Sequence, residues 1–124
     1  MPRKSILLSV AAFIIAITAL PASATRVGDG DLQFSCFKGI GYWSYTPDLG
    51  VRLFGISAVV LGESSGLSED VARIYPGETG TVYGNTIRSF TDKRLVMEGS
   101  IVSSSGGYGF SVGARCQGRQ SLPR

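Results

Sequence analysis

The chain of 124 residues contains no histidine. Histidine is the commonest general base near neutral pH, the base of Ser-His and Cys-His catalytic systems, and a frequent metal ligand, so its absence removes all three kinds of site. The only two cysteines, Cys36 and Cys116, are too far apart in sequence for a Cys-x-x-Cys redox motif. We therefore expect a non-enzymatic protein that holds no metal and no cofactor.

The chain has little excess charge once its N-terminal segment is set aside. It contains 12 Lys and Arg against 9 Asp and Glu. Two of the basic residues, Arg3 and Lys4, lie in the first 24 residues, which contain no acid, so the remainder has a net charge near +1. Nucleic-acid binding needs a dense basic patch. We expect no nucleic-acid partner.

The first 24 residues have the three parts of a secretory signal peptide. Arg3 and Lys4 form a positive region, residues 6–20 are almost wholly apolar, and Pro21 precedes the small residues 22–24. A membrane-spanning helix needs roughly 20 apolar residues, more than this run provides. The pattern predicts cleavage after Ala24, no transmembrane anchor afterwards, and one small domain, residues 25–124, in the periplasm or outside the cell.

The predicted export bears on the state of the two cysteines. In an oxidising compartment an isolated pair is most simply a disulfide, although two separate buried thiols are the alternative. Cys36 and Cys116 each lie on the apolar face of an alternating segment, one near the start and one near the end of the domain. A bond between them would bring the first and last strands together, as in a closed barrel or a tight sandwich.

The domain reads as short strands joined by glycine-rich turns, since all 17 glycines follow residue 24. The expected strands are residues 32–37, 42–45, 51–61, 81–83, 86–90, 95–102 and 108–116. The last two form the clearest hairpin. In the longest, the alternating residues are expected to share one face, with a bulge at Gly55; they are Phe54, Ile56, Ala58 and Val60.

One segment favours a helix. Ser68 is a suitable N-cap, followed by acidic residues in the first turn. Val71, Ile74 and Tyr75 fall at helical spacing, and Pro76 ends the segment. Residues 25–31 and 117–124 are polar and expected to be flexible. The predicted fold is all-β, a small antiparallel β-barrel or sandwich with one short helix and a disulfide.

Two short motifs suggest chemistry that their context does not support. Residues 109–113 match the G-x-S-x-G pattern of a hydrolase nucleophile, but Ser111 falls in the middle of a predicted strand and no histidine is available. Asp29-Gly30-Asp31 resembles the start of a calcium loop, yet position 12 of that pattern is Ile40 rather than glutamate. We expect an outward-facing serine and a solvated arm.

The candidate binding residues gather around the only tryptophan. Within residues 42–45, Tyr42 points to one side of the strand, and Trp43 and Tyr45 point to the other. Exposed aromatic side chains mark contacts with partners or ligands, and Arg52 and Arg94 are candidates for the rim. The alternative is that both sides of this strand are covered and the aromatic side chains serve packing.

The outline of the chain is similar to that of periplasmic inhibitors of C-type lysozyme. Those are small exported β-barrels with an aromatic-x-Cys near the start, matched here by Phe34-Ser35-Cys36, and a second cysteine near the end, matched by Cys116. The family's Ser-Gly-x-x-Tyr segment is not reproduced, because Ser105-Gly106-Gly107-Tyr108 is one residue short. Toxin B-subunits stapled by a disulfide have a comparable outline. No functional residue is carried over from either resemblance.

We therefore expect an exported module that binds another protein, as an inhibitor or an accessory subunit of a periplasmic or secreted system. The first alternative is a glycan-binding or host-directed secreted subunit in which the region of Tyr42 and Trp43 stacks on sugar. The second is a structural component of the envelope.

Overall fold

The computed structural model describes residues 23–118, which form eight β-strands and no helix. The strands, in chain order, are β1 (Ser23–Arg26), β2 (Gly30–Phe37), β3 (Ile40–Pro47), β4 (Leu53–Gly62), β5 (Ser68–Glu78), β6 (Val82–Asn85), β7 (Arg94–Ser103) and β8 (Gly106–Gln117). The prediction of an all-β domain is confirmed.

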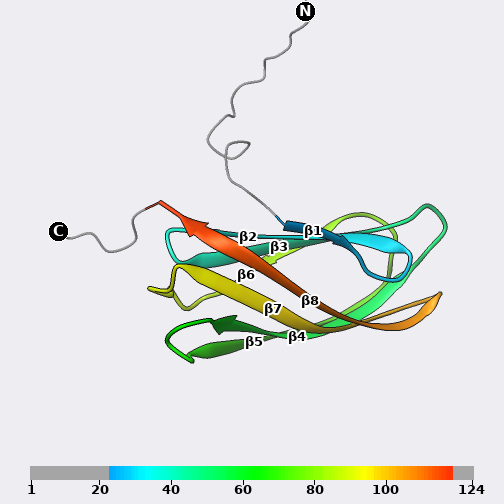
Figure 1. Ribbon diagram of the computed structural model, residues 1–124. Helices are drawn as coiled ribbons and strands as arrows, with labels where there is room; N and C mark the ends of the chain where they lie inside the picture. Colours follow the sequence, from blue (N-terminus) through cyan, green and yellow to red (C-terminus); the bar gives the residue numbers. More distant parts are fainter. Residues whose placement is uncertain (1–22, 119–124) are drawn as a thin grey trace, which may run out of the picture.

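The strands form one strongly curved sheet in the order β5-β4-β7-β8-β2-β3-β6, and β1 pairs with β2. Every neighbouring pair is antiparallel except β2 and β8, which run parallel over two residue pairs. In Figure 1, β1, β2 and β3 lie on one side of the molecule, β4 and β5 lie on the other, and β8 crosses between them to end beside β2. The result is a nearly closed, barrel-shaped sheet.

Alternating side chains from both halves fill the interior. Along β2, Leu32, Phe34 and Cys36 are buried, while Asp31 and Gln33 are exposed. The same inward set continues through the other strands, and Phe90 from the connection between β6 and β7 joins it. The largest fully buried members on the other strands include Tyr45, Leu53, Ile56, Leu95, Met97 and Ile101. The period-two pattern in the sequence therefore specifies the core correctly in β2, β7 and β8.

The bulge expected at Gly55 is confirmed, because the pairing of β4 with both neighbours shifts register between Leu53 and Gly55. The shift moves Leu53 into the core and leaves Phe54 outside, 40% exposed. The expectation that Phe54 shares the inward face of Ile56 is therefore wrong. A strict period of two cannot hold through a bulge, since the extra residue reverses the faces before it.

The helix expected from Ser68 is wrong, because these residues form β5, which pairs with β4 from Leu53–Glu78 to Leu61–Ser68. Val71 faces the core, but Ile74 is 94% exposed, so no apolar helical stripe is buried here. An N-cap is a local interaction that stabilises a helix by about 1 kcal/mol. The backbone hydrogen bonds between β5 and most of β4 stabilise the strand by more than that. Pro76 is tolerated because β5 is an edge strand.

Glu69, expected in the first turn of that helix, has a different role. Its two carboxylate oxygens accept hydrogen bonds from the backbone N–H groups of Ile87 (2.8 Å) and Arg88 (2.7 Å). These bonds tie the edge strand β5 to the segment after β6, at the place where the two ends of the sheet approach each other. Within residues 23–118, the Glu69 side chain therefore links the two ends of the sheet, which no strand pairing joins.

Residues 86–90 are not the strand that the sequence indicated. The segment turns inward at both ends and buries Thr86 and Phe90. The Thr86 hydroxyl accepts a hydrogen bond from the backbone N–H of Gly41 (3.0 Å) and donates one to the Arg88 carbonyl (3.0 Å). A buried hydroxyl bonded to the backbone replaces the ladder that alternation alone would suggest.

The N-terminal segment differs from the loose arm expected for residues 25–31. Thr25 and Arg26 belong to β1, and Asp31 belongs to β2. Arg26 forms ion pairs with Asp31 (3.1 Å) and Asp48 (2.6 Å), and its hydrogen bond holds the pKa of Asp48 below its usual value. Of the expected leader, residues 1–22 lie outside the described residues, as does the tail from residue 119, while Ser23 and Ala24 lie in β1.

Candidate binding surfaces

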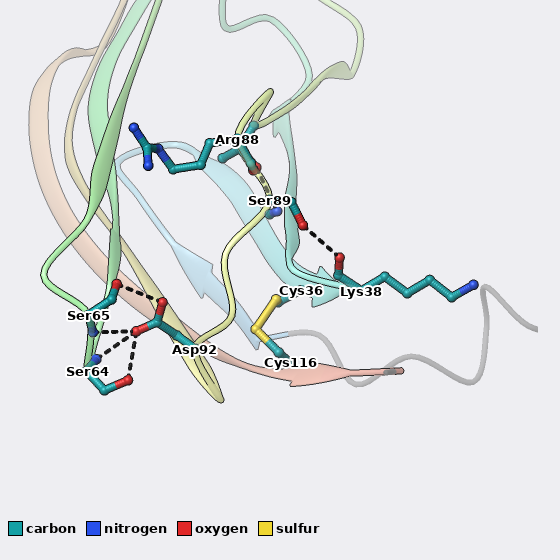
Figure 2. Close-up of a disulfide and its surroundings, with 10 residues drawn as sticks. Cys36, Lys38, Ser64, Ser65, Arg88, Ser89, Asp92 and Cys116 are labelled. Carbon is teal, nitrogen blue, oxygen red and sulfur yellow. Dashed lines mark hydrogen bonds between the residues drawn. A yellow bond between two sulfur atoms is a disulfide. The ribbon is translucent and has the colours of Figure 1, made fainter. Parts of the chain in front are cut away.

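The predicted disulfide is present between Cys36 of β2 and Cys116 of β8, with an S–S distance of 2.06 Å (Figure 2). The two residues are direct neighbours in the parallel pairing, with their Cα atoms 4.5 Å apart. Since β2 and β8 pair only at Cys36–Cys116 and Phe37–Gln117, the bond lies at the narrowest junction between the two halves of the sheet. It links the two halves of the sheet covalently.

A second tie lies close to the disulfide. Asp92, only 3% exposed, accepts four hydrogen bonds of 2.7–2.9 Å from the backbone N–H and hydroxyl groups of Ser64 and Ser65 (Figure 2). Burial raises the pKa of this carboxyl, but the four bonds outweigh burial and lower it. Asp92 therefore fixes the β4–β5 turn to the connection from β6 to β7, and it is an anchor rather than an acid–base catalyst.

Two of the predicted binding aromatics are core residues. Trp43 is 3% exposed and Tyr45 is fully buried, and the Tyr45 hydroxyl donates a hydrogen bond to the Val27 carbonyl (2.8 Å). The Trp43 indole lies against Gly84 of β6, where any Cβ would overlap it. Only Tyr42, 42% exposed, remains on the outside. The expectation that Trp43 and Tyr45 offer an exposed contact is thus corrected, because their side of β3 is the barrel interior.

The predicted rim does not assemble either. Arg94 begins β7, whereas Arg52 lies just before Leu53, which pairs with Ser103 at the other end of β7. At roughly 3.4 Å per residue, the length of β7 separates them by about 30 Å. Arg94 contacts Glu63 at 3.4 Å, and the backbone N–H of Arg52 donates to the Ser104 hydroxyl. Neither arginine accompanies Tyr42.

Ser111 lies where it is expected, but Asp29-Gly30-Asp31 is not a solvated arm, because Gly30 and Asp31 belong to β2 and Gly30 is buried. Ser111 is exposed in the middle of β8, paired opposite Glu98, and no nucleophile elbow surrounds it. Asp29 lies between β1 and β2, where its carbonyl accepts a hydrogen bond from the Asp48 backbone. Among residues 23–118, no group of three or more cysteine or acidic side chains is arranged to hold a metal ion.

Two outer surfaces remain as candidates, and the first is poor in large side chains. We call it the small-residue face. In register, Gly55 of β4 lies between Ile74 of β5 and Val102 of β7, and the next row consists only of Ala72, Ser57 and Ser100. These residues line a groove of about 300 Å³. Ile74 (94% exposed) and Val102 (50% exposed) form its walls.

The small-residue face continues onto β8 and ends at a free strand edge. Gly107 and Gly109 lie opposite Val102 and Ser100, so the sheet stays almost bare there. On the other side β5 is the end of the strand order, and within the described part of the chain its outer edge pairs with no strand. The groove therefore lies beside the part of this edge that follows Glu69, whose side chain bonds to the segment after β6.

The second surface covers the outside of β2, β3 and β6, and we call it the tyrosine face. Two rows cross these strands, Gln33–Ser44–Tyr83 and Ser35–Tyr42–Asn85. Tyr83 is 76% and Tyr42 is 42% exposed. A shallow depression of about 220 Å³ lies between them. No side chain in either row carries a charge.

Sequence reasoning missed Tyr83 and Ile74. Tyr83 falls in the predicted strand 81–83, but nothing in the sequence says that β6 lies beside β3 and so brings Tyr83 next to Tyr42. Ile74 was assigned to the buried side of the expected helix. The proline at position 76 was the one signal for an edge strand.

The comparisons with known proteins add little. No protein-family model matches the chain, and no curated protein matches it. Among solved structures, one described as the X-ray structure of Northeast Structural Genomics Consortium target SoR45 has a TM-score of 0.40 and 11% sequence identity, over 85% of this chain and 89% of that chain. A similarity this distant does not indicate a function for this chain.

Proposed function

We propose that this is an exported, non-enzymatic module that binds another protein through the small-residue face, as an inhibitor or an accessory subunit. The disulfide is compatible with a periplasmic or extracellular location. Residues 23–118 contain no helix long and apolar enough to cross a membrane. The single observation that supports protein binding is the apolar groove between Ile74 and Val102 beside the free edge of β5.

The expected partner segment is an extended strand. An exposed edge has unpaired backbone N–H and C=O groups, and a strand of another protein satisfies them by adding to the sheet. One side chain of that added strand would then lie in the groove, which Gly55 leaves open because it has no side chain. Backbone bonds supply affinity in this arrangement and the groove supplies specificity. An apolar side chain suits walls made of isoleucine and valine.

The test compares two exposed aliphatic residues, only one of which lines the groove. Oxidised wild-type protein, Ile74→Asp and Leu49→Asp are used as baits against envelope and secreted proteins from the source organism, because Leu49 is fully exposed in the turn between β3 and β4 and does not line the groove. We expect wild type and Leu49→Asp to retain the same identified protein in stoichiometric amount, and Ile74→Asp to lose it at least tenfold. Hydrogen exchange of the reconstituted complex should show new protection of β5 amides.

Three results would contradict the proposal. They are the absence of any stoichiometric partner, equal retention by Ile74→Asp, and a wild-type homodimer in sedimentation that Ile74→Asp converts to monomer. The last would assign the edge to self-association. Both substituted positions are surface positions, where changes in stability usually stay within about 0.5 kcal/mol, so all three proteins should fold.

A further inference from the structure

We infer that the tyrosine face is a second binding site, separate from the small-residue face, and that it takes an uncharged oligosaccharide. The inference does not rest on the proposed protein-binding function, since the two faces lie on different halves of the sheet. Four observations carry it. They are the pair of exposed tyrosines, their spacing, the absence of charge in the two rows that contain them, and the support beneath them.

The two tyrosines are diagonal neighbours. Tyr42 pairs with Asn85 and Ser44 pairs with Tyr83, so Tyr42 and Tyr83 are offset by two residues across adjacent strands. Such diagonal pairs are about 7–8 Å apart, within reach of each other's rings. Two rings at this spacing on one twisted sheet form a platform longer than a single monosaccharide. An oligosaccharide can lay the C–H face of successive pyranose rings on them.

The other side chains in these two rows are hydrogen-bonding groups without charge. Gln33 and Asn85 offer amide donors and acceptors, and Ser35 and Ser44 offer hydroxyls. The Asn85 amide nitrogen also donates to the Thr86 carbonyl (2.9 Å), which holds this side chain in place. Sugar hydroxyls both donate and accept, so they match such a set. An anionic or cationic ligand would find no opposite charge in these two rows.

The platform is rigid from below. On the inner side of the same strands, the Trp43 indole packs against Gly84, directly between the strands that carry Tyr42 and Tyr83. A substituent at Gly84 would displace the indole, so the position of the indole against β6 depends on this glycine. A preformed surface loses little conformational entropy on binding. Trp43, the only tryptophan, is also a reporter directly behind the site.

The experiment starts with an array of neutral and acidic glycans. The full-length exported protein, oxidised, is applied to the array, and neutral hits are titrated in solution with Trp43 fluorescence as the readout. We expect at least one neutral oligosaccharide to bind and acidic glycans not to be preferred. Tyr83→Ala and Tyr42→Ala should each weaken binding about tenfold or more. Tyr83→Phe, which keeps the ring, should retain most of the affinity.

Phe54→Ala is the matched control, because Phe54 is an aromatic residue of similar exposure to Tyr42 on the opposite half of the sheet. It should leave sugar affinity unchanged. Silence across the neutral glycans, signals confined to acidic glycans, or equal binding by Tyr83→Ala would each overturn the inference. Since Ile74→Asp should bind sugar normally, failure of the protein-binding proposal and failure of this one are distinguishable.

Discussion

The small-residue face and the tyrosine face both belong to strands whose side chains alternate between the core and the outside. They differ in the side chains that point outward. In the two rows around the groove, the outward positions of β4, β5, β7 and β8 are glycine, serine and alanine, with Ile74 and Val102 as isolated walls. On β2, β3 and β6 they are two tyrosines among amides and hydroxyls. Both halves share one core, so the difference between the faces lies in residues that contribute little to folding.

The contrast has a physical consequence. Small outward side chains let another backbone come close to the sheet, and a free edge beside them offers unpaired hydrogen-bonding groups. Tyrosine rings keep a backbone away but provide a broad surface with polar ends. One face therefore suits a strand of protein, and the other suits a flat, hydroxylated ligand. Three predictions test how independently the two halves carry these faces.

The largest effect is expected at the junction. Cys36 and Cys116 close a loop with a sequence separation of 80 residues, so their bond stabilises the folded state by about 4.5 kcal/mol in the chain-entropy model. We expect the double variant Cys36→Ser/Cys116→Ser to lose stability of that order, measured as the denaturant midpoint against oxidised wild type. Reductant should lower the wild-type midpoint and leave that of the double variant where it is. An unchanged midpoint after reduction would show that the two halves hold together without the bond.

The next effect separates inward from outward glycines within one half. A Cβ at Gly99 would overlap the Ser57 carbonyl oxygen and the Cα of Ala58, whereas a Cβ at Gly109 would meet nothing closer than 3.7 Å. Gly99→Ala should therefore cost about 2–3 kcal/mol, because backbone must move. Gly109→Ala should stay within about 0.5 kcal/mol. Equal urea midpoints for the two variants would show that Gly99 is not required for the close packing of its strand against Ser57 and Ala58.

The smallest effect concerns the anchor near the junction and depends on pH. Because the pKa of Asp92 is lowered in the folded protein, its contribution to stability is fully present above the unfolded pKa of about 3.9. That contribution is lost as the pH falls through the folded pKa. Asp92→Asn, which leaves Ser64 and Ser65 without a charged acceptor, should cost about 2 kcal/mol at pH 7.

Urea denaturation of wild type and Asp92→Asn between pH 2 and pH 8 measures this directly. The difference in unfolding free energy should be constant above about pH 5 and should shrink below about pH 4. Glu98→Gln, an exposed acid on β7, serves as the control and should show no such change. A difference for Asp92→Asn that persists to pH 2 would show that the carboxylate charge is not what stabilises the turn.

A structural feature could be predicted from the sequence where its signal lies in nearby residues, and not where it depends on which strands pair. The β7–β8 hairpin, the disulfide and the bulge at Gly55 were read correctly, because alternation, cysteine count and a mid-strand glycine are local signals. The helix at Ser68 was wrong because capping and spacing are also local, but pairing with β4 outweighed them. The exposed aromatic site failed at Trp43 and Tyr45, since alternation separates two sides of a strand without saying which is inside.

The sequence by itself determined the class of this protein. The absence of histidine excluded histidine-dependent sites, the glycine-rich alternating segments indicated β-strands, and the position of the two cysteines joined the first strands to the last. Only the tertiary structure decided which side of β3 faces the core, that β6 lies beside it, and that β5 is a free edge. These are questions of strand order, which follows from long-range pairing and shared burial and is not encoded in any one segment.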